Sequence, residues 1–279
     1  MRLILIKFCL ICCLGLSLTG CESLKNFSFK KSETEEEYAG WSAEKFRKEA
    51  NAALDSGNYK KAIELYEALE SRYPFGESSA QTQLDIAYAY YKNDEPDAAI
   101  AAADRFIKTN PRNPSVDYAY YLKGLVNYNR GFGFLDRYLP IDSSQRDQTT
   151  AQEAYNNFDE LIRRFPNSKY VPDAKQRMIA LRNNLAMHEI HIARYYMKRK
   201  AYIAAADRAS GVIEKYDRTP AVPYALQIMQ EAYSKLELPN EAKEVALIYE
   251  KNFPNGPPVP EHQNATFSHK VWDFIGLEK

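Results

Sequence analysis

Cysteine is scarce in this chain of 279 residues and is confined to its beginning. The four cysteines are Cys9, Cys12, Cys13 and Cys21, and none follows them. A framework of disulfides and a cysteine-based metal site are therefore excluded for the body of the chain. A body of this length buries enough apolar surface to be stable without disulfides.

An excess of either charge is also missing, because 37 lysines and arginines balance 37 aspartates and glutamates. Proteins that read nucleic acids usually concentrate basic side chains on one surface, and no stretch here does so. We therefore expect no nucleic-acid partner. Alternating apolar and polar residues, the pattern of β-strands, are rare, whereas apolar residues at helical spacing are common. We expect an all-α protein.

Patterns that carry catalysis or bind metals are lacking too. His188 and His191 stand three apart on a predicted helix, but the chain has only four histidines, and no cysteine or acidic ligand set completes a site. A solvated or partly packed helix face is the better interpretation. The segment Gly131-Phe132-Gly133 lacks the flanking strand and third glycine of a dinucleotide loop. We expect no catalytic residue, no metal and no enzyme activity.

What the chain does contain is an internal repeat. A shift of thirty-seven residues aligns Ala62 with Ala99, Leu69 with Phe106 and Pro74 with Pro111. The same spacing of small and bulky residues returns at three further places, which begin at Ala154, Ala205 and Ala242. Small and bulky residues at this spacing, closed by a proline, are typical of the tetratricopeptide repeat, a pair of antiparallel helices of about 34 residues. We expect a tetratricopeptide-repeat solenoid of about five helix pairs with a concave face.

The first twenty residues differ from the repeats. An apolar run whose beginning is flanked by Arg2 and Lys7 is too short to span a membrane comfortably. It predicts a cleaved signal peptide over residues 1–20 rather than an uncleaved anchor. The segment Leu18-Thr19-Gly20-Cys21 resembles a bacterial lipobox, in which the cysteine becomes the lipidated N-terminus. We expect diacylglycerol and an N-acyl chain on Cys21 and no other cofactor. Glu22, in place of an aspartate, favours the outer membrane.

The repeats divide the remaining chain. Residues 21–41 are polar and without period, which predicts a flexible tether. Repeats one to three are expected over residues 42–166 with an insertion at 131–150, and repeats four and five over 167–254. The insertion is rich in apolar residues, so we expect it to pack down on the solenoid. Residues 255–279 form a tail with a proline cluster and a final apolar face, which caps the last repeat or binds a partner.

A peptide-binding groove is expected along the first helices of repeats one to three. Two rows of residues step by one repeat each and should line this groove. Tyrosine combines a broad apolar ring with a hydroxyl, which suits an extended peptide. Packing between helices is the alternative role for each of these side chains. The six residues are Asn51, Tyr88 and Leu125 in one row, and Leu54, Tyr91 and Tyr128 in the next.

Four segments resemble the BamD family of outer membrane lipoproteins, also called competence lipoproteins, of the β-barrel assembly machinery. With the lipobox, they extend the resemblance over nearly the whole chain from Cys21 to about Pro254. The segments are RYPFGESSAQTQLDIAYAYYKN (72–93), AAIAAADRFIKTNPRNPSVDYAYYLKGL (98–125), DSSQRDQTTAQEAYNNFDELIRRFPNSKY (142–170) and DAKQRMIALRNNLAMHEIHIARYYMKR (173–199).

This resemblance implies a non-enzymatic scaffold, held by its lipid on the periplasmic face of the outer membrane. Family members contact the periplasmic domains of BamA through their C-terminal repeats, bind BamC and BamE, and receive segments of unfolded β-barrel proteins on their N-terminal repeats. By its surrounding pattern, Arg208 corresponds to an arginine that the family uses near BamA. The tail after Pro254 departs from the family pattern.

Two other functions stay open from the sequence. Another lipid-anchored tetratricopeptide adaptor, such as a type IV pilus pilotin, should lack the insertion and the YPFG segment. A cell-wall enzyme would need a second, catalytic domain, for which the sequence provides no candidate.

Overall fold

The computed structural model describes residues 38–75, 78–130, 144 and 147–257. Over these residues the chain forms ten helices and no strand, which confirms the all-α prediction. Cys21, the signal peptide, most of the insertion and the tail beyond residue 257 lie outside them. The helices are α4 (Ala43–Asp55), α5 (Tyr59–Arg72), α6 (Ser79–Lys92), α7 (Pro96–Thr109), α8 (Val116–Arg130), α9 (Thr149–Arg164), α10 (Val171–Lys198), α11 (Tyr202–Lys215), α12 (Val222–Lys235) and α13 (Pro239–Asn252).

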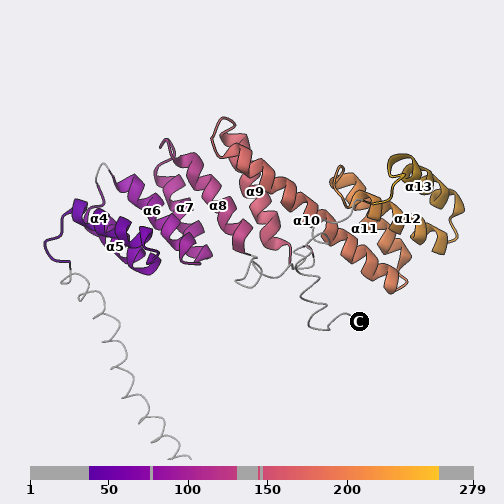
Figure 1. Cartoon of the computed structure of the whole chain (residues 1–279), viewed down its shortest axis with the longest axis horizontal. Coiled ribbons are helices and arrows are strands. Elements are labelled where there is room, and N and C mark those ends of the chain that lie inside the picture. Colours follow the sequence, from indigo (N-terminus) through magenta and orange to yellow (C-terminus); the bar gives the residue numbers. More distant parts are fainter. Residues whose placement is uncertain (1–37, 76–77, 131–143, 145–146, 258–279) are drawn as a thin grey trace, which may run out of the picture.

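The helices pair in chain order and stack into an elongated array (Figure 1). Each helix packs on the one before and the one after it, as expected of tetratricopeptide repeats. Among alternate helices, the most extensive contacts join first helices of the pairs, α6 with α8 and α10 with α12. This closer approach places the first helices on the inner, more tightly curved side of the described array.

The turn inside each pair repeats the same backbone conformation. Gly57, Asp94, Lys200 and Glu237 follow the first helix of their repeats, and all four have a positive φ of 59° to 79°. Such a φ is the left-handed conformation that lets the chain reverse after a helix. Gly131 is the next member of the series that starts at Gly57 and Asp94, and it is where the insertion begins. The insertion therefore enters at the turn of repeat three.

Several helices of both kinds begin with a local capping residue or a proline. The side chain of Asn58 accepts a hydrogen bond from the backbone N–H of Lys61 at 3.3 Å, which satisfies one of the free N–H groups at the start of α5. Proline occupies the first turn of α7, α10, α12 and α13, where its missing N–H has no partner to lose.

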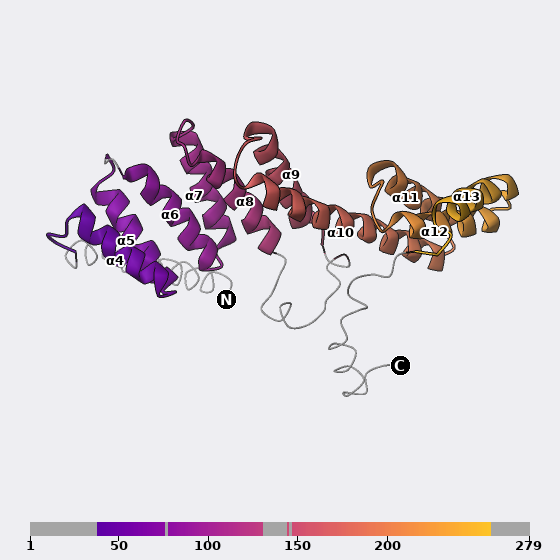
Figure 2. The same cartoon turned by 45° about the horizontal axis from the view of Figure 1, so that its top comes forward.

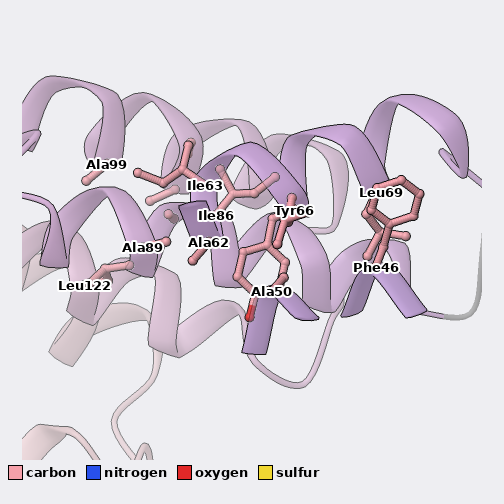
Figure 3. Close-up of a cluster of buried hydrophobic side chains, with 14 of the residues drawn as sticks. Phe46, Ala50, Ala62, Ile63, Tyr66, Leu69, Ile86, Ala89, Ala99 and Leu122 are labelled. Atoms are coloured by element: carbon pink, nitrogen blue, oxygen red, sulfur yellow. The ribbon is translucent and has the colours of Figure 1, made fainter. Parts of the chain in front are cut away.

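The buried positions follow the repeat register. Ala62, Ala99, Ala154 and Ala205 are all fully buried, because each allows the partner helix to approach closely. Figure 3 shows the resulting core of the first repeats, in which Leu69 of α5 lies beside Phe46 of α4, and Tyr66 of α5 lies beside Ala50 of α4. Burial of each large side chain stabilises the array by about 1.5–3 kcal/mol.

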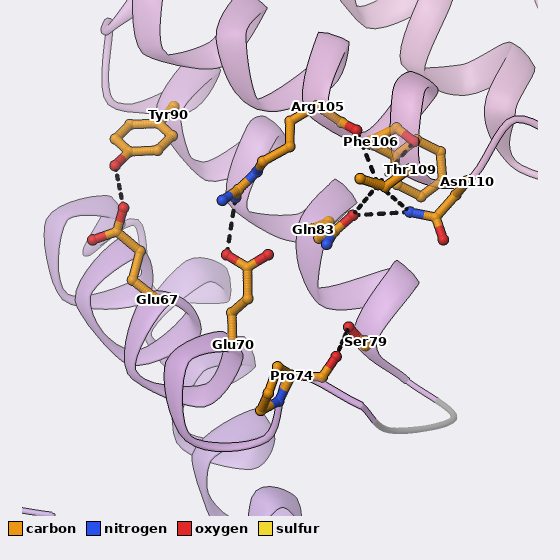
Figure 4. Close-up of polar contacts among 10 residues, drawn as sticks. All are labelled: Glu67, Glu70, Pro74, Ser79, Gln83, Tyr90, Arg105, Phe106, Thr109 and Asn110. Carbon is orange, nitrogen blue, oxygen red and sulfur yellow. Dashed lines mark hydrogen bonds and ion pairs between the residues drawn. The ribbon is translucent and has the colours of Figure 1, made fainter.

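Polar contacts also join successive repeats on the outside of this core (Figure 4). Arg105 of α7 forms an ion pair with Glu70 of α5 at 2.9 Å, and Tyr90 of α6 donates a hydrogen bond to Glu67 of α5. Exposed pairs of this kind add little stability each.

The long helix α10 belongs to two cores. Leu181 packs with α6 to α9, whereas Ala186 and the residues after it pack with α11 to α13. In both views α10 links the helices α4–α9 to the helices α11–α13 (Figures 1 and 2). Its 28 residues agree with the single long helix expected between repeats three and four.

Ordered packing begins earlier than the sequence indicated. Residues up to 41 were expected to be a tether, but Tyr38 is buried against repeat one, and its ring lies 4.9 Å from that of Trp41. The carbonyl of Tyr38 accepts a hydrogen bond from Arg72 at 2.6 Å, and its hydroxyl accepts one from Lys61 at 2.5 Å. An aromatic side chain so placed covers the open end of the first helix pair.

Among the described helices, none combines the length and the apolar composition that crossing a membrane requires.

Candidate functional site

The six predicted groove residues lie on the inner layer of helices, two each on α4, α6 and α8. Asn51 is exposed, and its side-chain oxygen accepts a hydrogen bond from the hydroxyl of Tyr66 at 2.6 Å. The other five are half-buried and contact the cores beneath them, so each has a packing role as well as a solvent-facing part. The packing interpretation therefore applies to these five side chains, and the role of all six residues in binding a peptide stays a prediction.

The structure brings the second and third helices of this layer together through tyrosine. The hydroxyl of Tyr91 accepts a hydrogen bond from the side-chain amide of Asn129 at 2.8 Å, which joins α6 to α8. The rings of Tyr88 and Tyr91 lie 6.2 Å apart. Repeats two and three are thus joined on this layer by a tyrosine hydroxyl and an amide.

A polar network that the sequence did not indicate ties this surface to α10. The hydroxyl of Tyr121 donates a hydrogen bond to Asp173 at 2.6 Å, and Arg177 binds the same carboxylate through Nε at 2.6 Å. The guanidinium of Arg177 also lies 4.8 Å from the ring centre of Tyr128, a cation–π distance. Tyr128 of the groove is thereby held by α10.

These contacts shift the pKa values of the groups involved. Burial, followed by the hydrogen bond to Asp173, raises the pKa of Tyr121 to about 12. Burial would raise the pKa of Asp173, but hydrogen bonds from Arg177 and Tyr121 outweigh it and lower that pKa. At neutral pH the network therefore contains a charged carboxylate, a charged guanidinium and a neutral phenol.

The two histidines considered for metal binding have a different role. Nδ1 of His188 donates to the carbonyl oxygen of Ser144 at 2.7 Å, and Nε2 of His191 lies 3.0 Å from the Ser144 hydroxyl. Ser144 is 2% exposed. The insertion is therefore anchored on α10 at this residue; its packing at 131–143 and 145–146 lies outside the described residues. Across the described part of the chain, no group of three metal-ligating side chains occurs.

A hollow between α10 and α12 was missed by the sequence reasoning. Its volume is about 580 Å³, and its lining combines two basic residues, Arg194 and Lys198, and the rings of Tyr195 and Tyr224 with one acidic residue, Glu231. The guanidinium of Arg194 lies 5.2 Å from the ring centre of Tyr224. Basic and aromatic groups together suit an acidic or carboxylate-bearing segment of another protein. No sequence motif marks it, because its residues come from two helices of different repeats.

Arg208 lies on α11, next to a second hollow of about 260 Å³. It donates a hydrogen bond to Glu189 of α10 at 3.0 Å, and this contact raises the pKa of its guanidinium. The side chain is exposed, so a partner can reach it. Arg208 lies in the C-terminal repeats, away from the groove residues of α4, α6 and α8. Its role as a partner contact stays a prediction.

Comparison with known proteins identifies the family. Residues 41–247 match the YfiO family, described as outer membrane lipoprotein. The outer membrane protein assembly factor BamD of Neisseria meningitidis serogroup B is 46% identical over 251 residues, which cover 90% of this chain and 92% of that protein. The BamD protein of Vibrio cholerae is 39% identical over 204 residues, which cover 73% and 85%.

The likeness to solved structures is weaker. A kinesin light chain with tetratricopeptide-like repeats from Podosopora anserina covers 74% of this chain and 92% of its own, with 16% identity and a TM-score of 0.33. Values this low add no argument to the relationship seen in the sequences. The match over most of the chain shows that this protein belongs to the YfiO family of outer membrane lipoproteins, together with the assembly factors named BamD.

Proposed function

We propose that this protein is a lipid-anchored adaptor of the β-barrel assembly machinery, which helps β-barrel proteins to fold and insert into the outer membrane. The observation that carries the proposal is the 46% identity to a BamD protein over 90% of this chain. The adaptor works by holding two kinds of chain side by side: an unfolded substrate segment and the periplasmic domains of BamA.

The substrate segment binds along the inner layer of repeats one to three. Tyr88, Tyr91 and Tyr128 provide rings for apolar side chains, while Asn51 and the tyrosine hydroxyls provide hydrogen-bonding groups for an extended backbone. The ion pair of Arg177 with Asp173 fixes the ring of Tyr128 from α10. The surface is thus pre-formed, which lowers the entropic cost of binding a disordered segment.

The C-terminal repeats dock on the machinery. Arg208 and the hollow between α10 and α12 present charged and aromatic groups on the part of the array away from the groove. BamA binds here, and BamC and BamE also bind this protein. Lipidation of Cys21 confines the protein to the periplasmic face of the outer membrane, so that each encounter takes place at the membrane surface.

The groove is tested by photo-crosslinking. A photoreactive amino acid is placed at Tyr91 or Tyr128, and the protein is irradiated with a peptide that carries the last strand of a barrel protein. Crosslinks are expected at both positions. Tyr73, which is 38% exposed near the end of α5, is the matched control. Equal labelling at Tyr73 would contradict a groove on the inner layer.

Docking is tested by co-purification with BamA. Arg208→Glu reverses the charge beside Glu189 and is expected to reduce the amount of BamA retained. Arg163→Glu is the control, because Arg163 is an exposed arginine of α9 that pairs with Asp159 of its own helix. If the Arg208 variant retains as much BamA as the parent protein, Arg208 is not part of the interface.

A further inference from the structure

The last helix of the described array leaves apolar side chains in solvent. On α13, Leu247 is 56% exposed and Ile248 is 50% exposed. Only Ala242 and Val245 of this helix are buried, whereas α12 before it buries six residues. A terminal repeat usually ends in a polar face, because no further repeat covers it.

The repeat register shows what Leu247 faces. When Ala62, Ala99 and Ala242 are aligned, Leu247 of α13 falls on Glu67 of α5 and Asp104 of α7. Both acidic residues contact the first helix of the following repeat. Glu67 accepts a hydrogen bond from Tyr90 of α6 (Figure 4), and Asp104 forms an ion pair with Lys123 of α8 at 2.7 Å. Position 247 therefore faces the place of a next helix.

Two more positions of α13 give the same indication. Tyr249 and Ala246 align with Phe106 and Ala103 of α7, which are fully buried by α6 and α8. On α13 the corresponding side chains are only half-buried. At these positions α13 thus has the apolar residues of an interior helix. Where α5 and α7 carry an acidic residue, α13 carries Leu247.

The chain itself provides a segment that fits this face. Residues 258–279 follow directly after the described part, and Phe267, Val271, Phe274 and Ile275 have the i, i+4, i+7, i+8 spacing of an apolar helix face. The ten residues after Pro257 reach up to about 33 Å when extended, and the fourteen residues of α13 span about 21 Å. The segment can therefore reach any point along α13.

We propose that residues 267–277 form an amphipathic helix that packs on Leu247 and Tyr249 of α13 and closes the array within the same molecule. The segment occupies the place that α6 and α8 take on α5 and α7. This closure is separate from the proposed adaptor role and does not depend on it.

Tryptophan fluorescence tests the proposal directly. The chain has two tryptophans, Trp41 just before repeat one and Trp272 in the tail, so Trp41→Phe leaves Trp272 as the single reporter. In the chain from residue 22 onward, acrylamide quenching of Trp272 is expected to be several-fold weaker than in a synthetic peptide of residues 258–279. Adding Leu247→Glu is expected to raise the quenching to the level of the peptide.

Ile203→Glu is the matched control, because Ile203 is 73% exposed on α11 and lies in another repeat. It is expected to leave the quenching low. The proposal would be overturned if Trp272 in the Trp41→Phe chain, with α13 unchanged, were quenched as strongly as in the free peptide. It would also be overturned if Leu247→Glu and Ile203→Glu changed the quenching equally.

A cysteine pair distinguishes closure within one chain from pairing between copies. The chain from residue 22 has no cysteine, so Leu247→Cys with Val271→Cys gives a single possible disulfide inside a monomer. A crosslinked monomer is expected on mild oxidation at every protein concentration. Disulfide-linked dimers that increase with concentration would show that the tail binds a second copy and would refute closure within one chain.

Discussion

Gly124 of α8 lies directly against the ring of Phe158 of α9. A Cβ atom on Gly124 would stand 2.4 Å from Cε1 of that ring, well inside van der Waals contact, and Phe158 is fully buried. Glycine at this position therefore allows the two helices of repeat three to approach closely.

Gly124→Ala is expected to lower the free energy of unfolding. Overpacking costs about 1–3 kcal/mol, and the better helix propensity of alanine returns up to about 1 kcal/mol. Urea unfolding followed by circular dichroism measures the net loss. Gly211→Ala is the matched control, since a Cβ at Gly211 of α11 meets nothing within 4 Å. That variant is expected to be unchanged or more stable, and equal losses in both would contradict the contact.

The network of Asp173 predicts a dependence of stability on pH. Because the folded-state pKa of Asp173 is lowered, its contribution is present above the ordinary carboxyl pKa and is lost as pH falls through the lowered value. Asp173→Asn is therefore expected to destabilise the protein at neutral pH, and the difference from the parent should vanish in acid.

The size of this effect is modest. The side chain of Asp173 is 43% exposed, so solvent screens its charge, and the loss at neutral pH is expected to be about 1 kcal/mol or less. Asp159→Asn, at a surface pair within α9, is the control. Thermal unfolding of both variants across the acid range measures the difference, and a gap that stays constant with pH would exclude a role for the charge.

His188→Ala is expected to release the anchored end of the insertion. The substitution removes the donor to the buried carbonyl of Ser144, which costs about 1 kcal/mol. Hydrogen exchange of the peptide spanning residues 144–150 should speed up. His262→Ala, in the tail, is the histidine control. Added zinc should not change the exchange of the parent protein, and zinc-dependent protection would restore the metal-site interpretation.

Removal of residues 36–41 is expected to destabilise repeat one. Tyr38 is buried and bonded to Arg72 and Lys61, so a chain that begins at residue 42 should lose about 2–3 kcal/mol relative to one that begins at residue 36. Thermal unfolding of the two chains gives the comparison. Tyr38→Phe keeps the ring and should lose only about 1 kcal/mol. Equal stability of both chains would show that residues 36–41 do not stabilise repeat one and belong to the tether.

The helix pairs could be predicted because their signals are local and repeated. Ala62, Ala99 and Ala154 are small where helices meet, and each copy repeats the same period, so the burial of these alanines followed from the sequence. The positive φ shared by Gly57 and Asp94 could also have been expected, but a turn residue other than glycine gives a weak signal.

Contacts between distant residues could not be predicted in the same way. Tyr121 and Asp173 are 52 residues apart, and nothing in either neighbourhood indicates the other. Tyr38 follows a run of three glutamates, so its local composition resembles a tether although its ring is buried. The hollow beside Arg194 depends on how α10 and α12 are placed, which is set by the whole stack.

The continuity of α10 has a mechanical consequence. One unbroken ladder of backbone hydrogen bonds runs from the core around Leu181 to the core around Ala186. Force applied to either half is therefore transmitted along a stiff rod, and the Ser144 anchor on His188 and His191 braces that rod from the side near its midpoint. A bend in α10 at this point would change the angle between the helices α4–α9 and the helices α11–α13.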